Sequence, residues 1–325
     1  MNKVISFGEA LIDMLSNRVG GADLDGPETF TRYPGGAPAN VAVAVAKLGG
    51  RSHFAGKVGQ DMFGDCLRDA MANAGVNTDY LLQTTEAKTA LAFVSLDEHG
   101  ERSFEFYRSP SADLLFRPEE FGSDWFDEPG IFHFCSNTLT EAGIRDTTMA
   151  GVAKAHEKGY LVSFDINLRH NLWPSDLDPT PFIWQAIEQT DLLKLCTEEL
   201  AFLCRNQSED EVIQRIRDAG VSLILVTDGG NPLRYYCGGK SGRELNGELQ
   251  PPKTKVIDST AAGDAFTGGV LYALSKRDIS RDRLQSLSDR ELLEAVLNTG
   301  MQCGAFAVTR KGAFDALPAQ TDLSL

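Results

Sequence analysis

The segment Asp258–Phe266, which reads DSTAAGDAF, places two carboxylates on either side of a run of small residues that ends in a glycine. The preceding residues Lys253–Ile257 (KTKVI) predict a strand, and the following AFTGGVLYALS predicts a helix. A point where a strand is followed by a helix is the usual place for chemistry in an α/β protein. The two acids Asp258 and Asp264 are therefore candidates for chemistry.

This segment has two interpretations. In the first it is only a helix start, with Thr260 as N-cap and Asp264 favoured in the first turn by the helix dipole. That leaves Asp258 and the small residues unexplained. In the second, backbone N–H groups of Ala261 to Asp264 converge on an anion at the helix N-terminus, and Asp264 takes a proton from an attacking hydroxyl.

A second candidate site is GGAPAN, in which Gly35 and Gly36 precede Pro38 and an apolar helix. It is either a loop and helix start, or a place where backbone without Cβ atoms approaches a ligand closely. In the second case Asn40 adds a side chain that donates and accepts. Asp13, expected near the end of the first strand, would accept a hydroxyl on the same edge.

Two arginines complete the candidates. Arg169 lies with Asp165 and Asn167 in DINLRH directly after an apolar strand, a group that is either a site or a salt-bridged surface. The planar guanidinium of Arg169 suits phosphate or carboxylate oxygens. Arg108 in FYRSPSAD ends a predicted hairpin, where it either reaches down from a lid or is a solvated charge beside a turn.

Composition limits the function classes. The chain has 325 residues and a net charge of −15, which argues against a nucleic-acid binder. Six cysteines without a C-x-x-C pair indicate reduced thiols, and no apolar run approaches the ~18 residues of a membrane span. We expect a cytoplasmic protein with no membrane contact. No G-x-G-x-x-G follows a strand, which disfavours a dinucleotide-dependent dehydrogenase.

Apolar strands alternate with amphipathic helices along most of the chain, which predicts a mostly parallel sheet covered on both faces. A hairpin pattern at residues 89–107 and a short strand at 29–36 depart from this rhythm. We expect them to form a small separate sheet, such as a lid, from segments of about 14–34 and 88–110. No linker divides the chain, so a single domain over residues 1–325 is expected.

DSTAAGDAF together with GGAPANVAVAVAKLGG and FAGKVGQDMFGD resembles the paired signatures of the ribokinase (PfkB-type) sugar kinase family. FYRSPSAD and DINLRHNLW are most similar to its bacterial fructokinase branch. The resemblance implies a ribokinase-like three-layer α/β/α sandwich with a small β-sheet lid. It also implies transfer of the ATP γ-phosphoryl group to a sugar hydroxyl, with D-fructose giving fructose 6-phosphate.

The resemblance assigns roles by matching motif positions. The catalytic group is Asp264 as base, with Ala261, Ala262 and Gly263 as anion hole, and Arg169. The sugar ligands are Asp13, Gly35, Gly36, Asn40, Tyr107, Arg108, Arg169 and Asp264. The ATP ligands are Lys194, Thr227, Gly229, Gly230, Gly263 and Asn298. The metal ligands are Asp258, Thr260, Ala307, Arg310 and Gly312 for K⁺, and Glu199 for Mg²⁺ through water.

Two positions depart from the family pattern: Ala316 stands where serine is frequent, and Cys196 where asparagine is common in the N-x-x-E element. The first could weaken the K⁺ site, and a thiol is a poor partner for hydrated Mg²⁺. The rival functions are a 2-keto-3-deoxygluconate kinase, an aminoimidazole riboside kinase, and a sugar-binding protein without catalysis. A homodimer that pairs two lids is also implied, because an apolar exposed hairpin is an edge liability.

Overall fold

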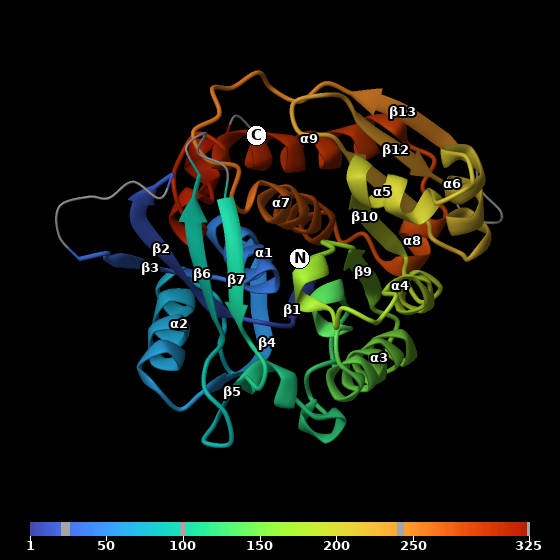
Figure 1. Cartoon of the computed structure of the whole chain (residues 1–325). Helices are drawn as coiled ribbons and strands as arrows, with labels where there is room; N and C mark the ends of the chain where they lie inside the picture. Colours follow the sequence, from blue (N-terminus) through green and yellow to red (C-terminus); the bar gives the residue numbers. More distant parts are fainter. Residues whose placement is uncertain (21–26, 98–101, 239–243, 324–325) are drawn as a thin grey trace.

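The computed structural model describes residues 1–20, 27–97, 102–238 and 244–323. Within them the chain forms three layers, a main sheet with helices on both faces, and a second, smaller sheet to one side (Figure 1). The main sheet has the order β13-β12-β11-β10-β9-β8-β1-β4-β5. Its strands are β1 (Lys3–Phe7), β4 (Arg51–Gly59), β5 (Leu81–Thr84), β8 (Gly130–Cys135), β9 (Leu161–Asp165), β10 (Leu192–Cys196), β11 (Leu223–Thr227), β12 (Leu233–Cys237) and β13 (Leu245–Leu249).

All the neighbouring pairs from β11 to β5 are parallel, and only β12 and β13 add antiparallel pairs at one edge. Alternate residues of each strand enter different cores, as the period of two requires. Val4 packs on one face and Ile5 on the other. The strand–helix alternation thus has the predicted consequence, a mostly parallel sheet buried on both sides.

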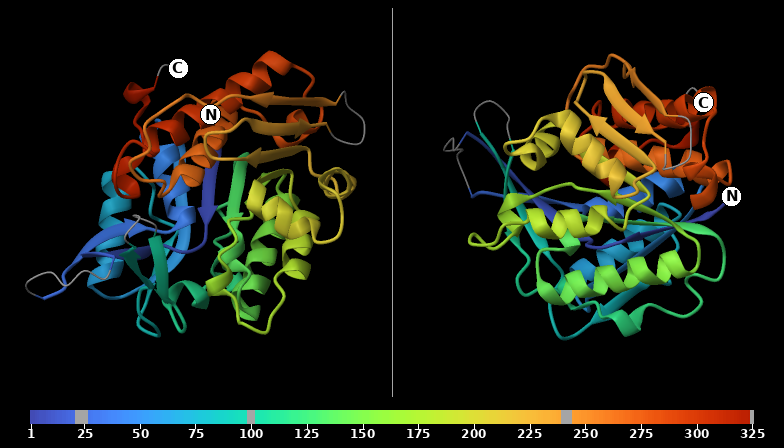
Figure 2. Two further views of the ribbon diagram at one scale, coloured as in Figure 1. Left: turned by 45° about the horizontal axis from the view of Figure 1, so that its top comes forward. Right: turned by 90° about the vertical axis from the view of Figure 1, so that its right-hand side faces the viewer.

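Two sets of helices cover these faces, and the right-hand view of Figure 2 shows them on opposite sides of the sheet. One core includes side chains of α3 (Ala142–Glu157), α4 (Thr180–Ile187), α5 (Thr197–Cys204) and α6 (Glu209–Asp218). The other core includes side chains of α1 (Ala37–Lys47), α7 (Ala262–Lys276), α8 (Arg281–Gln285) and α9 (Arg290–Ala307). A third cluster joins α1 and α2 (Met62–Asn73) to the smaller sheet.

The order in which successive strands are added to the main sheet reverses next to β1. From β1 the chain moves to β4 and β5 on one side, whereas β8, β9, β10 and β11 extend the sheet on the other. Such a switch point opens a crevice at the carboxyl ends of the two adjacent strands, where ligands of open α/β sheets bind. Here the adjacent strands are β1 and β8.

The smaller sheet has the order β3-β2-β6-β7 and is the lid that the sequence predicts. It contains β2 (Leu11–Val19), β3 (Phe30–Gly35), β6 (Leu91–Leu96) and β7 (Arg102–Tyr107). The predicted hairpin is confirmed as the antiparallel pair β6–β7. Residues 21–26 and 98–101 of the predicted lid segments lie outside the described residues.

Two local predictions are corrected. The first strand does not extend to the neighbourhood of Asp13 but ends at Phe7, because the backbone turns at Gly8, which has φ 149°, and the chain passes from β1 into the lid strand β2. Asp13 consequently belongs to the lid. Lys253–Ile257 is not a strand but an irregular segment that leads into α7. No helix within the described residues is long and apolar enough to cross a membrane.

Candidate active site

A cavity of about 740 Å³ lies at the switch point, between the main sheet and the lid. Its floor is formed by residues that follow β1, β8 and β9, and its walls by the N-terminal ends of α1 and α7. Phe104 and Phe106 of β7 close it from the lid side. The predicted residues that line it are Asp13, Gly36, Asn40, Arg169, Asp258, Thr260, Ala261 and Asp264.

The N-terminus of α7 is prepared for an anion. Helix α2 begins with Asp61, whose carboxylate accepts backbone N–H bonds, but α7 begins after Ala261, whose side chain makes no capping bond. Ala261 also has the left-handed backbone angles φ 56° and ψ 12°. Strained non-glycine residues cluster at functional sites, and an uncapped helix start offers N–H groups to an anion.

Gly263 has no side chain, which leaves space next to the first turn of α7. A Cβ atom built there would meet only the Lys194 side chain, with Nζ at 3.2 Å. The ammonium group therefore lies beside the first turn of α7, where it adds a full charge to the partial charge of the helix dipole. The two predicted ligands Gly263 and Lys194 are thus brought together.

Lys194 is held by a buried ion pair. Its Nζ donates to Asp165 Oδ1 at 3.1 Å, and both side chains are almost completely buried. Burial by itself would lower the pKa of Lys194, but Asp165, Glu199 and Asp264 together raise it. Thr267 Oγ1 of α7 donates to the other oxygen of Asp165 at 3.4 Å, which links the pair to the same helix.

Asp264 projects from the first turn of α7 into the cavity and is 8% exposed. Asn40 Nδ2 donates to its Oδ2 at 2.7 Å, and Asn167 Nδ2 approaches its Oδ1 at 3.4 Å. Burial raises the pKa of Asp264, while Asn40, Lys194 and Arg169 act in the opposite direction. A buried carboxylate that is held by amide donors and has a raised pKa is a suitable general base.

The start of α1 forms the opposite wall. Gly36 has φ 105°, and a Cβ atom there would lie 2.6 Å from the Glu9 carbonyl, so only glycine fits. At Gly35 an added Cβ would lie 2.5 Å from Asp13 Oδ2, which shows that the glycine makes room for that carboxylate. Helices α1 and α7 pack closely, because a Cβ atom at Gly268 of α7 would lie 2.5 Å from Ala44 Cβ of α1. This packing places the start of α1 next to Asp264.

The floor contains two residues that the sequence did not single out, Glu9 and Asn137, together with Asn167, which the sequence places beside Arg169 in DINLRH. Glu9 follows β1, Asn137 follows β8, and Asn137 Nδ2 donates to Glu9 Oε1 at 2.9 Å. Asn167 follows β9 with φ 38°, an unusual angle for a non-glycine residue. All three line the cavity. Polar residues at the carboxyl ends of strands adjacent to a switch point were the signal that could have found them.

The structure does not bring two predicted sugar ligands to the cavity. Tyr107 is 59% exposed and packs edge-on against Phe93, on the opposite face of the lid strand from Phe104 and Phe106. Arg108 is buried, with Nε on Asp113 Oδ2 at 2.7 Å and Nη2 on the Asn137 carbonyl at 2.8 Å. It is part of the scaffold beneath the floor.

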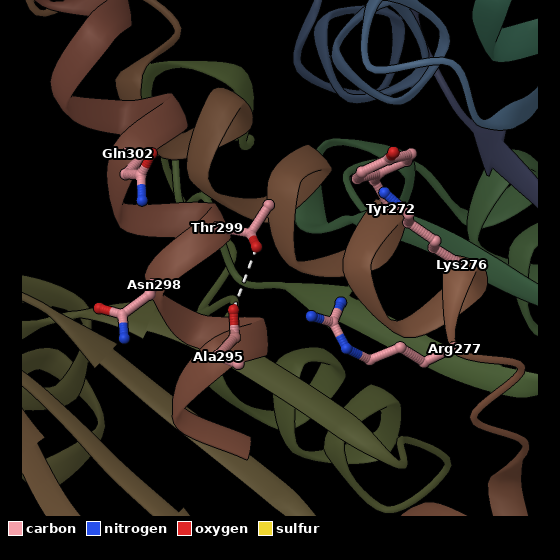
Figure 3. A pocket seen from close by; sticks show the side chains of 7 residues that line it. All are labelled: Tyr272, Lys276, Arg277, Ala295, Asn298, Thr299 and Gln302. Atoms are coloured by element: carbon pink, nitrogen blue, oxygen red, sulfur yellow. Dashed lines mark hydrogen bonds between the residues drawn. The ribbon is translucent and has the colours of Figure 1, made fainter. Parts of the chain in front are cut away.

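Asn298 also lies elsewhere. It lines a separate hollow between α7 and α9 with Tyr272, Lys276 and Arg277 (Figure 3). Lys276 ends α7 and Arg277 follows it as the C-cap, about 20 Å along the helix axis from Gly263 at 1.5 Å per residue, whereas Tyr272 is about 14 Å from Gly263. The structure therefore separates Asn298 from the anion hole.

The remaining nucleotide candidates follow the main sheet. Thr227 ends β11, next to β10 with Lys194 and Cys196, and Gly229 and Gly230 follow it with open space where a Cβ would stand. Glu199 accepts N–H bonds from Leu168 at 2.8 Å and from Cys196 at 2.7 Å, so its carboxylate connects the segments after β9 and β10. These residues extend from the anion hole along the carboxyl edge of the sheet.

The predicted K⁺ ligands surround the loop before α7. Asp258 Oδ1 accepts from the N–H and the hydroxyl of Thr260, and Oδ2 accepts from the Gly312 N–H at 3.1 Å. Ala307 ends α9, and its carbonyl accepts from the N–H of Arg310. Asp258 thus joins the two loops whose backbone carbonyls were predicted to hold the cation. Ala316 is buried and provides no hydroxyl.

This protein has the features of a small-molecule kinase: a mostly parallel sheet covered by helices, a helix start that can bind an anion, and a buried base beside it. In such enzymes phosphoryl transfer is catalysed mainly by positioning and by stabilisation of charge. The chain matches the model of the pfkB family carbohydrate kinases over residues 1–320, and it belongs to that family. The predicted resemblance and the ribokinase-like fold are confirmed.

Known relatives agree over nearly the full length. A probable fructokinase-5 of Arabidopsis thaliana is 38% identical over 320 residues, covering 98% of this chain and 95% of the relative. The crystal structure of a fructokinase from Xylella fastidiosa with bound ATP is 44% identical, with a TM-score of 0.91 and coverage of 98% and 96%. A fructokinase from Vibrio cholerae O395 in a form with bound fructose, ADP and calcium is 36% identical, with a TM-score of 0.84 and coverage of 99% and 97%.

Proposed function

We propose that this protein is an ATP-dependent fructokinase that transfers the γ-phosphoryl group of ATP to D-fructose and forms fructose 6-phosphate. The observation that carries the proposal is Asp264, a buried carboxylate that lies in the first turn of an uncapped helix and also lines a polar cavity. A base and an anion hole on the same helical turn fit a hydroxyl acceptor on one side and a phosphate on the other. The similarity to fructokinases supports fructose as the acceptor.

The roles follow from the geometry. A carboxylate cannot remove an alcohol proton in advance, because the pKa values of an acid near 4 and an alcohol near 16 are too far apart. Asp264 therefore accepts the proton as the new P–O bond forms. Backbone N–H groups at Gly263 and Asp264, together with Lys194, stabilise the charge on the transferred group. Arg169 and Asn40 orient Asp264 and the sugar.

ATP would extend from the anion hole across the end of β10 to Thr227, Gly229 and Gly230. Among the described residues there is no cluster of three or more metal-ligating side chains, so Mg²⁺ would be held mainly by ATP phosphates and water. Glu199 fits a contact through water, because both of its oxygens already accept backbone N–H groups. Bound Mg²⁺ would neutralise phosphate charge during transfer.

A monovalent cation fits beside Asp258. The predicted donor set is one carboxylate and the backbone carbonyls of Thr260, Ala307, Arg310 and Gly312, and oxygen donors of this kind suit a hard cation such as K⁺. The cation would stabilise the loop that begins α7. We expect activity to increase with K⁺ over Na⁺, and an equal rate in both salts would remove the K⁺ site from the proposal.

The test is ADP release with Mg-ATP and K⁺, measured with fructose, ribose, 2-keto-3-deoxygluconate and a nucleoside as acceptors. The proposal predicts turnover with fructose at the highest kcat/KM. Turnover with one of the other acceptors alone would replace fructose but keep the kinase mechanism. Binding of sugar without ADP release from any acceptor would favour a binding protein.

A homodimer through the lid is a second part of the proposal. The outer face of the lid carries an aromatic cluster in which Phe30 and Tyr107 both pack edge-on against Phe93. Phe30 is 39% exposed and Tyr107 is 59% exposed. Pairing of two lids would cover this apolar surface. We expect Phe30→Asp/Tyr107→Asp to convert a dimer into a monomer in sedimentation, and a wild-type monomer at micromolar concentration would contradict the proposal.

We place the enzyme in the cytoplasm. All six cysteines are free in the structure, and their thiols would persist in a reducing compartment.

A further inference from the structure

Asn171 links the lid to the wall of the cavity on the side of the main sheet. It lies in the 3-10 helix His170–Leu172, two residues beyond Arg169 of the cavity. Its Nδ2 donates to the carbonyl oxygen of Phe104 in β7 at 3.1 Å, across 67 positions of the chain. Phe104 also lines the cavity, so this hydrogen bond reaches the lid at the edge of the active site.

The acceptor of this bond lies on a free edge of the lid sheet. In the order β3-β2-β6-β7, strand β7 is the last strand and pairs with β6 on one side. An edge strand presents N–H and C=O groups that have no partner in the sheet, and Asn171 supplies a partner for one of them. Because Phe104 and Phe106 point to the same face of β7, a restraint on this edge restrains both rings that close the cavity.

The donor projects from a loop that is held on both sides. Before it, the Leu168 N–H donates to Glu199 Oε1 at 2.8 Å. After it, Trp173 is 7% exposed and stacks with Phe182, with ring centroids 6.1 Å apart. Asn171 itself is exposed and does not line the cavity. The hydrogen bond therefore connects the lid to an anchored part of the main domain.

We propose that Asn171 is a positioning residue that latches the lid over the cavity and acts on the reaction through Phe104 and Phe106. The latch is the hydrogen bond from Asn171 to Phe104. Its effect on turnover rests on the proposed kinase function and deepens it, whereas the latch is a property of the protein alone. With the lid held in place, the two rings cover the acceptor sugar and exclude water, which would otherwise take the phosphoryl group from ATP and release phosphate.

The alternative is a surface hydrogen bond without consequence, because water replaces an exposed amide donor at little cost. Both cases predict an unchanged melting temperature for Asn171→Ala, so stability does not separate them. They differ in the exposure of Phe104 and Phe106 and in the rate at which ATP is hydrolysed without sugar. One hydrogen bond shifts an equilibrium by about two- to tenfold, which sets the size of both effects.

The first measurement uses the protein without ligands. Hydroxyl-radical labelling followed by mass spectrometry measures the exposure of Phe104 and Phe106. Asn171→Ala should increase the labelling of both rings by about two- to tenfold. Asn171→Asp keeps the size of the side chain but places an acceptor against the carbonyl, so it should increase the labelling at least as much. Wild-type labelling in both variants would overturn the latch, whatever the enzyme phosphorylates.

Ser103→Ala is the matched control. Ser103 is also an exposed residue of β7, and its hydroxyl is hydrogen-bonded to that of Ser95 at 2.6 Å within the lid itself. The substitution removes a hydrogen bond from the lid but keeps the link to the main domain, so labelling and kinetics should match wild type. An equal increase of labelling in Ser103→Ala would assign the effect to a general loosening of the lid and overturn the inference.

The second measurement is kinetic. For Asn171→Ala the KM for fructose should rise by about two- to tenfold, and the rate of ATP hydrolysis without sugar by a similar factor. The kcat at saturating fructose should stay within about twofold of wild type, because Asn171 lies outside the cavity that contains Asp264. Increased labelling with a wild-type KM and wild-type ATP hydrolysis would show that the lid moves without acting on the reaction, and would overturn the proposed role.

Failure of the proposed function gives a different result. If the wild type releases no ADP with any acceptor, the kinase proposal is wrong, and the labelling of Phe104 and Phe106 still decides the latch. If the wild type uses a sugar other than fructose, the KM for that sugar takes the place of the KM for fructose. Melting temperatures establish that each variant is folded.

Discussion

The two ends of α7 border two hollows, and both contain polar side chains. At the N-terminal end the cavity holds Asp264, Asn40 and Glu9, all less than 10% exposed. At the C-terminal end the hollow between α7 and α9 holds Lys276, Arg277 and Asn298 (Figure 3). The difference between them lies in what the polar groups already bind.

In the C-terminal hollow three polar groups have partners close by. Thr299 donates to the Ala295 carbonyl within its own helix, Arg277 donates to the Ala273 carbonyl, and Lys276 lies over the ring of Tyr272. At the N-terminal end, the helix start is uncapped and buried acceptors remain unpaired. Buried groups with unused hydrogen-bonding capacity, rather than concave shape, therefore distinguish the active site from the hollow at the other end of α7.

The largest effect that tests this comparison is expected from Asp264→Asn. Loss of a general base typically lowers the rate by about 10²–10⁴, so kcat should fall by that factor in the coupled assay. The amide oxygen still accepts from Asn40, so fructose and ATP should bind with nearly unchanged affinity in calorimetry. Loss of binding together with activity would show that Asp264 is mainly a sugar ligand or a structural residue.

The stability of this variant gives an independent check. Burial raises the pKa of Asp264 in the folded protein, so the native state disfavours the charged form. The stabilisation that comes from this raised pKa is fully present at pH values below the pKa of Asp264 in the unfolded chain. It is lost as the pH rises through the pKa of Asp264 in the folded protein. At neutral pH the charge is a cost, and Asp264→Asn should melt at or above the wild-type temperature.

The second prediction concerns Lys194 beneath the anion hole. Lys194→Met leaves Asp165 as an unpaired buried acid, which typically costs about 3–5 kcal/mol. Urea unfolding should show this loss, and the KM for ATP should rise because a charge beside Gly263 is removed. Lys194→Met/Asp165→Asn should recover much of the stability but not the KM. Recovery of both would mean that Lys194 serves only the scaffold.

The sequence alone predicts much of the active-site cavity, but it does not indicate the residues that meet only through the sheet topology. Asp264 and the small residues of Asp258–Phe266 form their part of the site from one continuous stretch of backbone. Their spacing in the sequence therefore indicates the anion hole and the base directly. Glu9 and Asn137 meet only because β1 and β8 are adjacent, although the two residues are 128 positions apart. No local sequence pattern can indicate a contact between residues so far apart in the chain.

The lid shows a different limit. Its hairpin is predicted by the sequence and is present, but the resemblance places Tyr107 in the pocket, whereas Phe104 and Phe106 line it. Successive strand residues point to opposite faces, so an error of one position exchanges inside for outside. The register is set by pairing with β6 and by packing on the cavity, which local alternation does not reveal. For the same reason the break between β1 and β2 at Gly8 was missed within an apolar run.

The third prediction is a pH profile, with a smaller effect. Asp264 must be ionised to accept a proton, and burial raises its pKa, so kcat should begin to fall at a higher pH than for an ordinary carboxylate. The bond from Asn40 favours the ionised form. Asn40→Ala should therefore raise the pKa further and move the acid limb of kcat to higher pH. An unmoved limb would assign it to another group.

The smallest effect is expected at the opposite end of α7. Asn298 is exposed and does not line the active-site cavity, so Asn298→Ala should change the free energy of unfolding by no more than about 0.5 kcal/mol. The KM for ATP should also stay within twofold of wild type, although sequence reasoning placed this residue near the adenine. Thr227→Val, at the end of β11, is the comparison variant that should raise it. A several-fold rise with Asn298→Ala would mean that the nucleotide reaches the second hollow, and the two ends of α7 would then belong to one site.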